Sequence, residues 1–177
     1  MDWLILLLCV VSSCFGLVLL FGAPYLPTLT KQMNIALDLL DLKPGETMIE
    51  LGSGDGKVLI AAAKRGWNAV GYELNPILYV LSRMRTWRYR KQVKIVWANF
   101  WIAEWPTADA IFSFVLARQM HKLDKTIEQK CHQPVSLASF GAPVPGRAII
   151  NHIQGVYLYE YTPKGNATVP RKLCGSN

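Results

Sequence analysis

The sequence predicts an α/β fold in which helices cover both faces of a doubly wound, mostly parallel sheet. Three observations support this prediction. Short apolar runs typical of strands alternate with amphipathic runs typical of helices between residues 47 and 130, and a glycine-rich turn follows the first strand run. The last strand runs have no helix between them, which indicates an antiparallel end to the sheet.

A long uncharged segment precedes this domain. No charged residue occurs from Trp3 to Ala23, and a helix of that length crosses a hydrocarbon layer of about 30 Å. We therefore expect residues 1–23 to form a transmembrane anchor helix. A cleavable secretory signal is an alternative, although the chain begins Met1-Asp2 without the positive region that such signals carry. A buried core helix is another.

The distribution of positive charge predicts the orientation of the anchor. All 19 Lys and Arg residues follow the hydrophobic segment. By the positive-inside rule, the protein is then single-pass, with its C-terminal domain on the cytoplasmic or mitochondrial matrix side of the membrane.

A proline-containing connector and an amphipathic helix occupy residues 24–46. Apolar side chains at helical spacing predict this helix from Lys31 to Leu42, and Pro44 and Gly45 end it. One domain follows over residues 47–162, and residues 163–177 form a tail. Its predicted strands are 47–51, 69–73, 93–98, 110–115, 135–140, 148–153 and 156–161, and its predicted helices are 57–65, 76–89 and 118–130.

The net charge of +7 is locally concentrated in the basic stretch 83–94, which contains no acidic residue. Its cations are Arg83, Arg85, Arg88, Arg90, Lys91 and Lys94. In an anchored protein we expect this stretch to contact anionic lipid headgroups, although a solvated helix face has the same pattern.

The cysteines have the spacing of neither a disulfide framework nor a metal site, so we expect a reducing compartment and no metal. They are Cys9, Cys14, Cys131 and Cys174.

The turn after the first strand is the main candidate site. Gly52, Gly54 and Gly56 let the backbone approach a ligand closely. Their spacing is G-x-G-x-G rather than the G-x-G-x-x-G of dinucleotide loops, and no Gly-Lys-Ser/Thr follows as in a P-loop. Glu50 and Asp55 would repel a phosphate but attract the sulfonium and ammonium groups of S-adenosylmethionine (SAM). We therefore expect SAM as the cofactor.

Two later strand ends agree with this expectation. Glu73 ends the second strand about 20 residues after the glycines, where an acidic residue accepts hydrogen bonds from both ribose hydroxyls of an adenosine cofactor. After the third strand, Asn99 and Phe100 are placed to hydrogen-bond and pack on an adenine ring. A surface glutamate and a plain turn asparagine are the alternatives.

These motifs resemble the class I, seven-β-strand SAM-dependent methyltransferases, which have a Rossmann-like fold. More narrowly, they are similar to the membrane-anchored mitochondrial lysine methyltransferases that act on the c subunit of ATP synthase and on the adenine nucleotide translocase, and to their small prokaryotic relatives. The resemblance rests on PYLPTLTKQ (24–32), ELGSGDGKVLIAAAKRG (50–66), AVGYELNP (69–76), SRMRTWR (82–88) and QMHKLDKTIE (119–128).

The resemblance implies a protein-lysine N-methyltransferase and matches the family's SAM-binding positions. With their neighbours and the adenine candidates, these positions are Glu50, Gly52, Ser53, Gly54, Asp55, Gly56, Glu73, Leu74, Asn75, Asn99 and Phe100. The chain departs from the family at Asn99, where Asp is usual, and at Val115 and Ala117, where Gly and Pro are usual.

A lysine acceptor must lose a proton before it can attack a methyl group, and a dry aromatic channel beside the sulfonium lowers its pKa. Channel candidates are Tyr25, Thr28, Trp101 and Phe114, each of which also fits a core position. No general base is identified, because His121, His132 and His152 lack a spacing that would join them.

The anchor would hold the site near the membrane, so we expect an integral membrane protein as the substrate. Two alternatives remain: a methyltransferase acting on a lipid, quinone, small molecule or RNA, and a catalytically inactive SAM-fold membrane adaptor. No Asn-Pro-Pro-Tyr motif follows the fourth strand, which counts against base methylation, and nucleic acid is not an expected partner.

Overall fold

The computed structural model describes residues 3–6, 8–9, 12–13 and 29–163. Within these ranges no helix is long and apolar enough to cross a membrane. Of the predicted anchor, residues 3–6, 8–9 and 12–13 are helical, and its remainder lies outside the described residues. The connector up to residue 28 and the tail from residue 164 also lie outside them. The anchor therefore stays a prediction.

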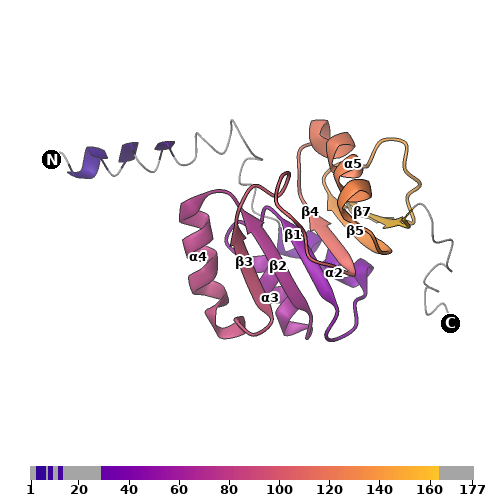
Figure 1. Cartoon of the computed structure of the whole chain (residues 1–177), viewed down its shortest axis with the longest axis horizontal. Helices are drawn as coiled ribbons and strands as arrows, with labels where there is room; N and C mark the ends of the chain where they lie inside the picture. The colour runs from indigo at the N-terminus through magenta and orange to yellow at the C-terminus, as the bar shows by residue number, and fades with distance from the viewer. Residues whose placement is uncertain (1–2, 7, 10–11, 14–28, 164–177) are drawn as a thin grey trace.

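The described chain forms one mixed sheet in the order β3-β2-β1-β4-β5-β7-β6 (Figure 1). Its strands are β1 (Thr47–Leu51), β2 (Asn68–Glu73), β3 (Val93–Trp97), β4 (Ala110–Ser113), β5 (Val135–Phe140), β6 (Asn151–Ile153) and β7 (Val156–Tyr161). The strands from β3 to β5 are parallel, and β7 runs antiparallel to both β5 and β6. The predicted parallel sheet with an antiparallel C-terminal pair is confirmed.

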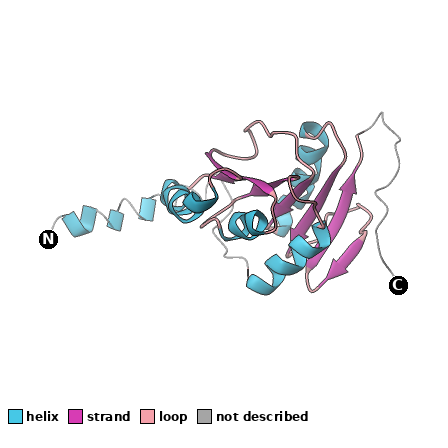
Figure 2. Cartoon of the chain, turned by 90° about the horizontal axis from the view of Figure 1, so that it is seen from below, coloured by secondary structure: helices cyan, strands magenta, loops and turns pink. Residues whose placement is uncertain are grey.

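Helices flank the sheet (Figure 2). They are α2 (Thr30–Leu40), α3 (Lys57–Lys64), α4 (Pro76–Thr86) and α5 (Met120–Lys130). Leu37 of α2 and Leu59 of α3 pack with Met48 on one side, and Leu123 of α5 packs with Ile49 on the other. Met48 and Ile49 are consecutive in β1, so the alternation of a strand supplies apolar side chains to both faces.

Several predicted elements end earlier than expected. The first helix stops at Leu40 because Asp41 takes a left-handed φ of 43° and its N–H bonds to the Leu37 carbonyl. Helix α4 gives way after Thr86 to the 3-10 turn η1 (Trp87–Tyr89).

Three other boundaries move by a few residues. A 3-10 turn, η2 (Ala117–Gln119), precedes α5, and β4 stops at Ser113 rather than residue 115. The predicted strand at 148–153 is reduced to β6, which pairs with β7 only over Asn151–Ile153. Edge strands such as β6 have a single partner, so their length is weakly determined by sequence.

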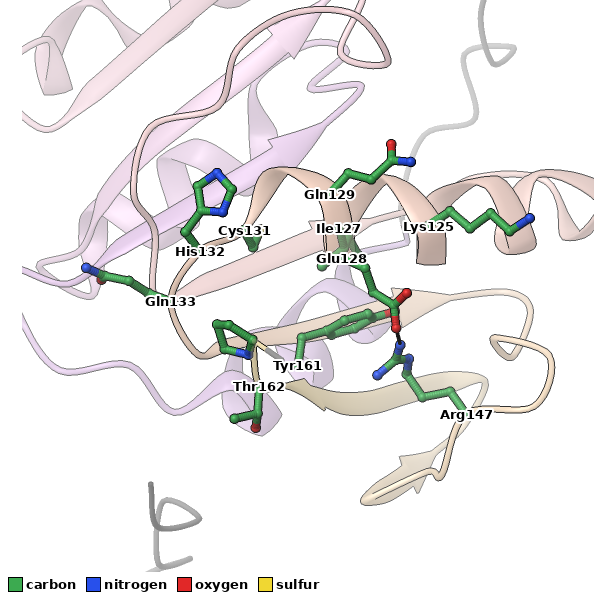
Figure 3. A pocket seen from close by; sticks show the side chains of 11 residues that line it. Lys125, Ile127, Glu128, Gln129, Cys131, His132, Gln133, Arg147, Tyr161 and Thr162 are labelled. Atoms are coloured by element: carbon green, nitrogen blue, oxygen red, sulfur yellow. Dashed lines mark hydrogen bonds and ion pairs between the residues drawn. The ribbon is translucent and has the colours of Figure 1, made fainter. Parts of the chain in front are cut away.

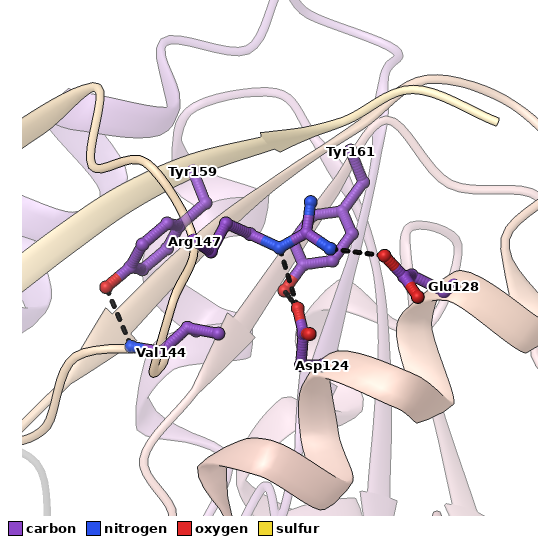
Figure 4. A network of polar contacts seen from close by, with 6 residues as sticks. All are labelled: Asp124, Glu128, Val144, Arg147, Tyr159 and Tyr161. Carbon is purple, nitrogen blue, oxygen red and sulfur yellow. Dashed lines mark hydrogen bonds and ion pairs between the residues drawn. The ribbon is translucent and has the colours of Figure 1, made fainter. Parts of the chain in front are cut away.

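A polar network joins α5 to the chain between β5 and β6 (Figure 4). Arg147 Nε donates to Asp124 at 2.6 Å, and its Nη2 donates to Glu128 at 2.5 Å. The Tyr161 hydroxyl donates to the same Asp124 oxygen at 2.8 Å, and the Arg147 guanidinium lies 3.8 Å from the Tyr161 ring centroid. Burial and the hydrogen bond to Asp124 raise the pKa of Tyr161, so its hydroxyl remains a donor.

Candidate functional site

The glycine turn and the end of β2 meet at the carboxyl edge of the sheet. Strands β1 and β2 are parallel, with Leu51 beside Tyr72. The N–H groups of Gly52 and Ser53 both donate to the Tyr72 carbonyl, at 3.0 and 2.9 Å. The turn is therefore docked on β2 just before Glu73, and the two predicted halves of the site lie together.

Glu73 is buried and held by the backbone of both turns. One carboxylate oxygen accepts from the Gly54 N–H at 2.8 Å, and the other accepts from the Asn75 N–H at 2.7 Å. Burial raises the pKa of Glu73, and these backbone hydrogen bonds oppose the rise. A carboxylate has about four acceptor positions, so each oxygen keeps one for a further donor. This arrangement fits the two hydroxyls of a ribose.

Glu50 is the second buried carboxyl. It is 4% exposed, and its Oε2 has no hydrogen-bond partner within the described part of the chain. Burial raises its pKa well above the ordinary value, and the charges of Asp55 and Glu73 raise it further. A buried carboxylate oxygen without a partner is costly. A cationic ligand group would therefore be stabilised at this position, and SAM has two such groups, its sulfonium and its ammonium.

Other buried polar atoms at this edge also lack partners among the described residues. They include Ser53 Oγ and Asn75 Nδ2. Buried polar groups are normally paired, so a group of unpaired atoms around one turn indicates a place for polar ligand atoms. The residues present fit a SAM-like cofactor.

The glycines of the turn have different reasons for lacking a side chain. Gly52 has a φ of +85°, and a Cβ there would meet nothing within 4 Å. Gly56 has a φ of +78°, but its Cβ would lie 3.1 Å from Thr86 Cγ2 and 3.2 Å from Ser82 Cβ. Gly52 thus faces open space on the ligand side, whereas Gly56 allows α4 to approach the turn.

Asp55 has a protein partner that the sequence did not reveal. Its carboxylate forms an ion pair with Arg85 of α4 and accepts from the Lys57 N–H at 3.2 Å. Arg85 therefore shares this carboxylate, and the expectation that Asp55 offers its charge to the ligand stays a prediction. The two residues are far apart in sequence, and no local pattern marks the pair.

Asn75 and Leu74 position the end of β2. Asn75 Oδ1 accepts from the N–H groups of Ile77 and Leu78, at 2.9 and 3.3 Å, and so caps α4. The Leu74 carbonyl accepts from Trp97 Nε1 at 3.0 Å. These contacts fix the backbone whose Asn75 N–H holds Glu73.

The adenine candidates follow β3 as expected, but their side chains are engaged within the protein. Asn99 Oδ1 accepts from the Trp101 N–H at 3.0 Å. Phe100 is only 6% exposed and packs in the core on the α5 side of the sheet. Neither contact was visible in the sequence, where Asn99 and Phe100 were interpreted only by their distance from the strand.

The acceptor-channel candidates are only partly located. Trp101 is half-buried, with Lys122 Nζ 4.3 Å from its ring centroid. Phe114 lies one residue beyond β4 and packs against Phe140 with ring centroids 4.6 Å apart. Tyr25 and Thr28 lie outside the described residues. The channel therefore stays a prediction, and Phe114 has a packing role in addition.

Sequence reasoning missed two residues of this edge. Ser113 ends β4 beside Leu51, is fully buried, and its Oγ has no partner among the residues described. Gly71 lies inside β2, where a Cβ would come within 2.6 Å of Leu59 Cδ1 and 2.7 Å of Ser53 Cβ. A glycine inside a strand is a signal for close approach and could have identified Gly71. Ser113 has no such signal.

A separate pocket of about 420 Å³ lies where the end of α5 meets the end of β7 (Figure 3). Cys131, His132, Arg147 and Tyr161 are among its lining residues. Burial raises the pKa of the Cys131 thiol to about 11, so the thiol is protonated near neutral pH. Tyr161 pairs with Val135 at the start of β5, so the pocket lies at the opposite end of the strands from the glycine turn. The described residues contain no cluster of potential metal ligands.

The chain is similar to known methyltransferases, in agreement with a SAM site at this edge of the sheet. A family model of the ANTKMT methyltransferase domain matches residues 50–150. The ATP synthase C-subunit lysine N-methyltransferase of Homo sapiens is 33% identical over 124 residues, which cover 69% of this chain and 53% of the relative. The adenine nucleotide translocase lysine N-methyltransferase of Mus musculus is 46% identical over 66 residues, covering 37% of this chain and 28% of the relative.

The fold is also shared with solved structures. An RNA methyltransferase from Salinibacter ruber in complex with S-adenosyl-L-homocysteine superposes with a TM-score of 0.71, covering 84% of this chain and 99% of that chain. At 23% sequence identity this likeness concerns the fold alone. The chain spans about half the length of the ATP synthase C-subunit lysine N-methyltransferases that it matches.

Proposed function

The chain belongs to the ANTKMT methyltransferase-domain family, and on that premise we propose that it is a SAM-dependent protein-lysine N-methyltransferase. One observation carries the proposal: the matched region contains both the glycine turn and Glu73, whose hydrogen bond to Gly54 joins them. The relatives of this chain include lysine methyltransferases of the ATP synthase C-subunit and of the adenine nucleotide translocase.

The described residues have distinct tasks in holding the cofactor. Glu73 would accept from the ribose hydroxyls, and the open side of Gly52 would let the backbone approach the ligand. Glu50 would place its unpaired buried oxygen near the cationic part of the ligand. When bound, SAM supplies a methyl group on a sulfonium, which is already a good leaving group.

The protein's contribution to the transfer step is alignment and the exclusion of water. The acceptor lysine must be neutral to attack, and its ordinary pKa of about 10.4 makes that form scarce at neutral pH. The half-buried Trp101 would shield the amine from water on the side of the β3 turn, and the ligand's positive charge favours the neutral amine. Trp101 is thus the described aromatic residue that we assign to the acceptor side.

We further propose that the substrate is an integral membrane protein and that the catalytic domain faces the cytoplasm or the mitochondrial matrix. The uncharged segment 3–23 and the position of the basic residues after it support this arrangement. The basic stretch 83–94 would face anionic headgroups.

Transfer of labelled methyl groups tests the proposal. The purified chain and its Glu73→Ala variant are incubated with labelled SAM and membrane fractions, followed by acid hydrolysis and amino-acid analysis. We expect label in methyl-lysine with the wild-type chain and none with Glu73→Ala.

Each other outcome identifies a different function. Label in lipid-extracted material or RNA would retain the enzyme and refute the lysine acceptor. SAM binding without transfer to any fraction, in membranes that contain the relatives' substrates, would favour an inactive SAM-fold membrane adaptor.

A further inference from the structure

Helix α4 buries two small polar side chains. Its buried residues are Leu78, Ser82 and Thr86. The small side chains of Ser82 and Thr86 are required there, because they lie against Gly56 at the start of α3. The buried face of an ordinary surface helix is apolar, so α4 departs from the usual pattern at Ser82 and Thr86.

The outward face of α4 is correspondingly apolar. With Trp87, the first residue of η1, we call it the outer stripe: Ile77, Val80, Leu81, Met84 and Trp87, with exposures of 37%, 54%, 41%, 71% and 61%. At 100° per residue these positions centre on the side opposite the buried face, with the i, i+3, i+4, i+7 spacing of one helix face. Exposed apolar residues are ordinary when scattered, but a continuous stripe indicates an interaction surface.

Cations border the outer stripe. Arg83, Arg88, Arg90 and Lys91 are all exposed, and no acidic residue occurs from residue 74 to 103. Arg90 lies over the Trp87 ring, with its guanidinium carbon 4.8 Å from the centroid. The surface thus combines an apolar centre with a border that is entirely positively charged.

Trp97 extends the surface toward the carboxyl edge of the sheet. It is 60% exposed at the end of β3 and stacks on Tyr79 of α4, with ring centroids 6.1 Å apart. Arg83 Nη1 donates to the Tyr79 hydroxyl on the same side. Aromatic rings with a polar edge are enriched where protein meets the membrane–water interface.

We propose that the outer stripe is a membrane-interface surface, which inserts between the headgroups of an anionic leaflet while the bordering arginines and lysines contact lipid phosphates. An apolar face with cationic flanks is the signature of a helix that lies in the interface plane. A second copy of the chain would bring like charges together, and RNA would engage the cations but leave the apolar stripe in water. The surface would fix the orientation of the domain on the membrane, and it does not depend on the reaction that the domain catalyses.

Side-chain oxidation in vesicles tests this surface. The full chain is reconstituted in vesicles of phosphatidylcholine alone or with phosphatidylglycerol, exposed to hydroxyl radicals and analysed by mass spectrometry. In the anionic vesicles, oxidation of Met84 and Trp87 should fall by at least about fivefold, because inserted side chains are shielded from water. Ile149 and Ile153, at 47% and 41% exposure near the opposite edge of the sheet, serve as internal controls and should not change.

A matched pair of charge variants completes the test. Arg88→Gln with Lys91→Gln should restore oxidation of Met84, since each removed cation weakens docking by about fivefold. Lys64→Gln with Lys125→Gln removes the same charge from exposed positions on α3 and α5 and should leave the protection intact. Equal oxidation of Met84 in both vesicle types would overturn the proposal. The proposal would also be overturned if Met84 became protected from oxidation in detergent as the protein concentration rises, because self-association would then explain the protection.

Discussion

Two alanine substitutions in the glycine turn should both lower stability but differ in their effect on SAM binding. Gly52 and Gly56 share a left-handed backbone, so alanine at either position costs about 1–2 kcal/mol of folding stability. At Gly56 the new Cβ also meets Thr86 and Ser82 within 3.2 Å. Overpacking of this kind adds about 1–3 kcal/mol. At Gly52 the Cβ meets nothing in the protein, but it enters the space that we assign to the ligand.

Thermal unfolding and SAM calorimetry separate the two effects. At about 3 °C per kcal/mol, the melting temperature should fall by about 3–6 °C for Gly52→Ala and by about 6–15 °C for Gly56→Ala. Measured at a temperature where both are folded, SAM affinity should fall at least about tenfold for Gly52→Ala and change little for Gly56→Ala. Wild-type affinity in Gly52→Ala, or equal losses of stability in both variants, would refute this reasoning.

Three further predictions concern the buried groups. Burial raises the pKa of Glu50, so this carboxyl ionises only as pH rises. Because the ionised form attracts a cationic ligand, SAM affinity measured by calorimetry should increase with pH. The affinity of Glu50→Gln should show no such increase. Cys131 has a pKa of about 11, so only about one molecule in a thousand carries the thiolate at pH 8. Its alkylation rate should therefore rise about tenfold per pH unit, and a plateau of the rate near pH 9 would contradict the burial of the thiol. Arg147→Met leaves Asp124 and Glu128 without their shared cation and should lower the free energy of unfolding by about 1–3 kcal/mol in denaturant titrations, while SAM affinity stays unchanged.

The fold was predictable because its signals are local. The apolar run of β1 and its glycine turn are contiguous in sequence, and the predicted bounds of β1, β5 and β7 are those observed. Boundaries failed where one residue's backbone conformation or a strand pairing decides them. The left-handed Asp41 ends α2, and pairing with β7 limits β6 to Asn151–Ile153, and no periodic pattern encodes either event.

The candidate site was predictable in its centre and not at its periphery. Glu73 and the glycine turn follow adjacent parallel strands, so their meeting follows from topology. The ion pair of Asp55 with Arg85 could not be predicted from topology, because Arg85 comes from a helix whose packing depends on the missing side chain of Gly56. For the same reason the basic stretch was interpreted by its charge alone, and the apolar outer stripe that it borders became visible only once the buried face of α4 was known.

The SAM affinity of Glu73→Gln tests the account most directly. Glutamine keeps the size of the side chain but replaces one acceptor oxygen with an NH2 donor. This donor would face the N–H of Gly54 or Asn75, and it cannot accept a hydrogen bond from a ribose hydroxyl. Glu160→Gln, at an exposed position on β7, is the matched control. The wild-type chain and Glu160→Gln should bind SAM equally in calorimetry, and folded Glu73→Gln should bind it at least about tenfold more weakly. Equal affinity of all three proteins, or no SAM binding by the wild-type chain, would contradict it.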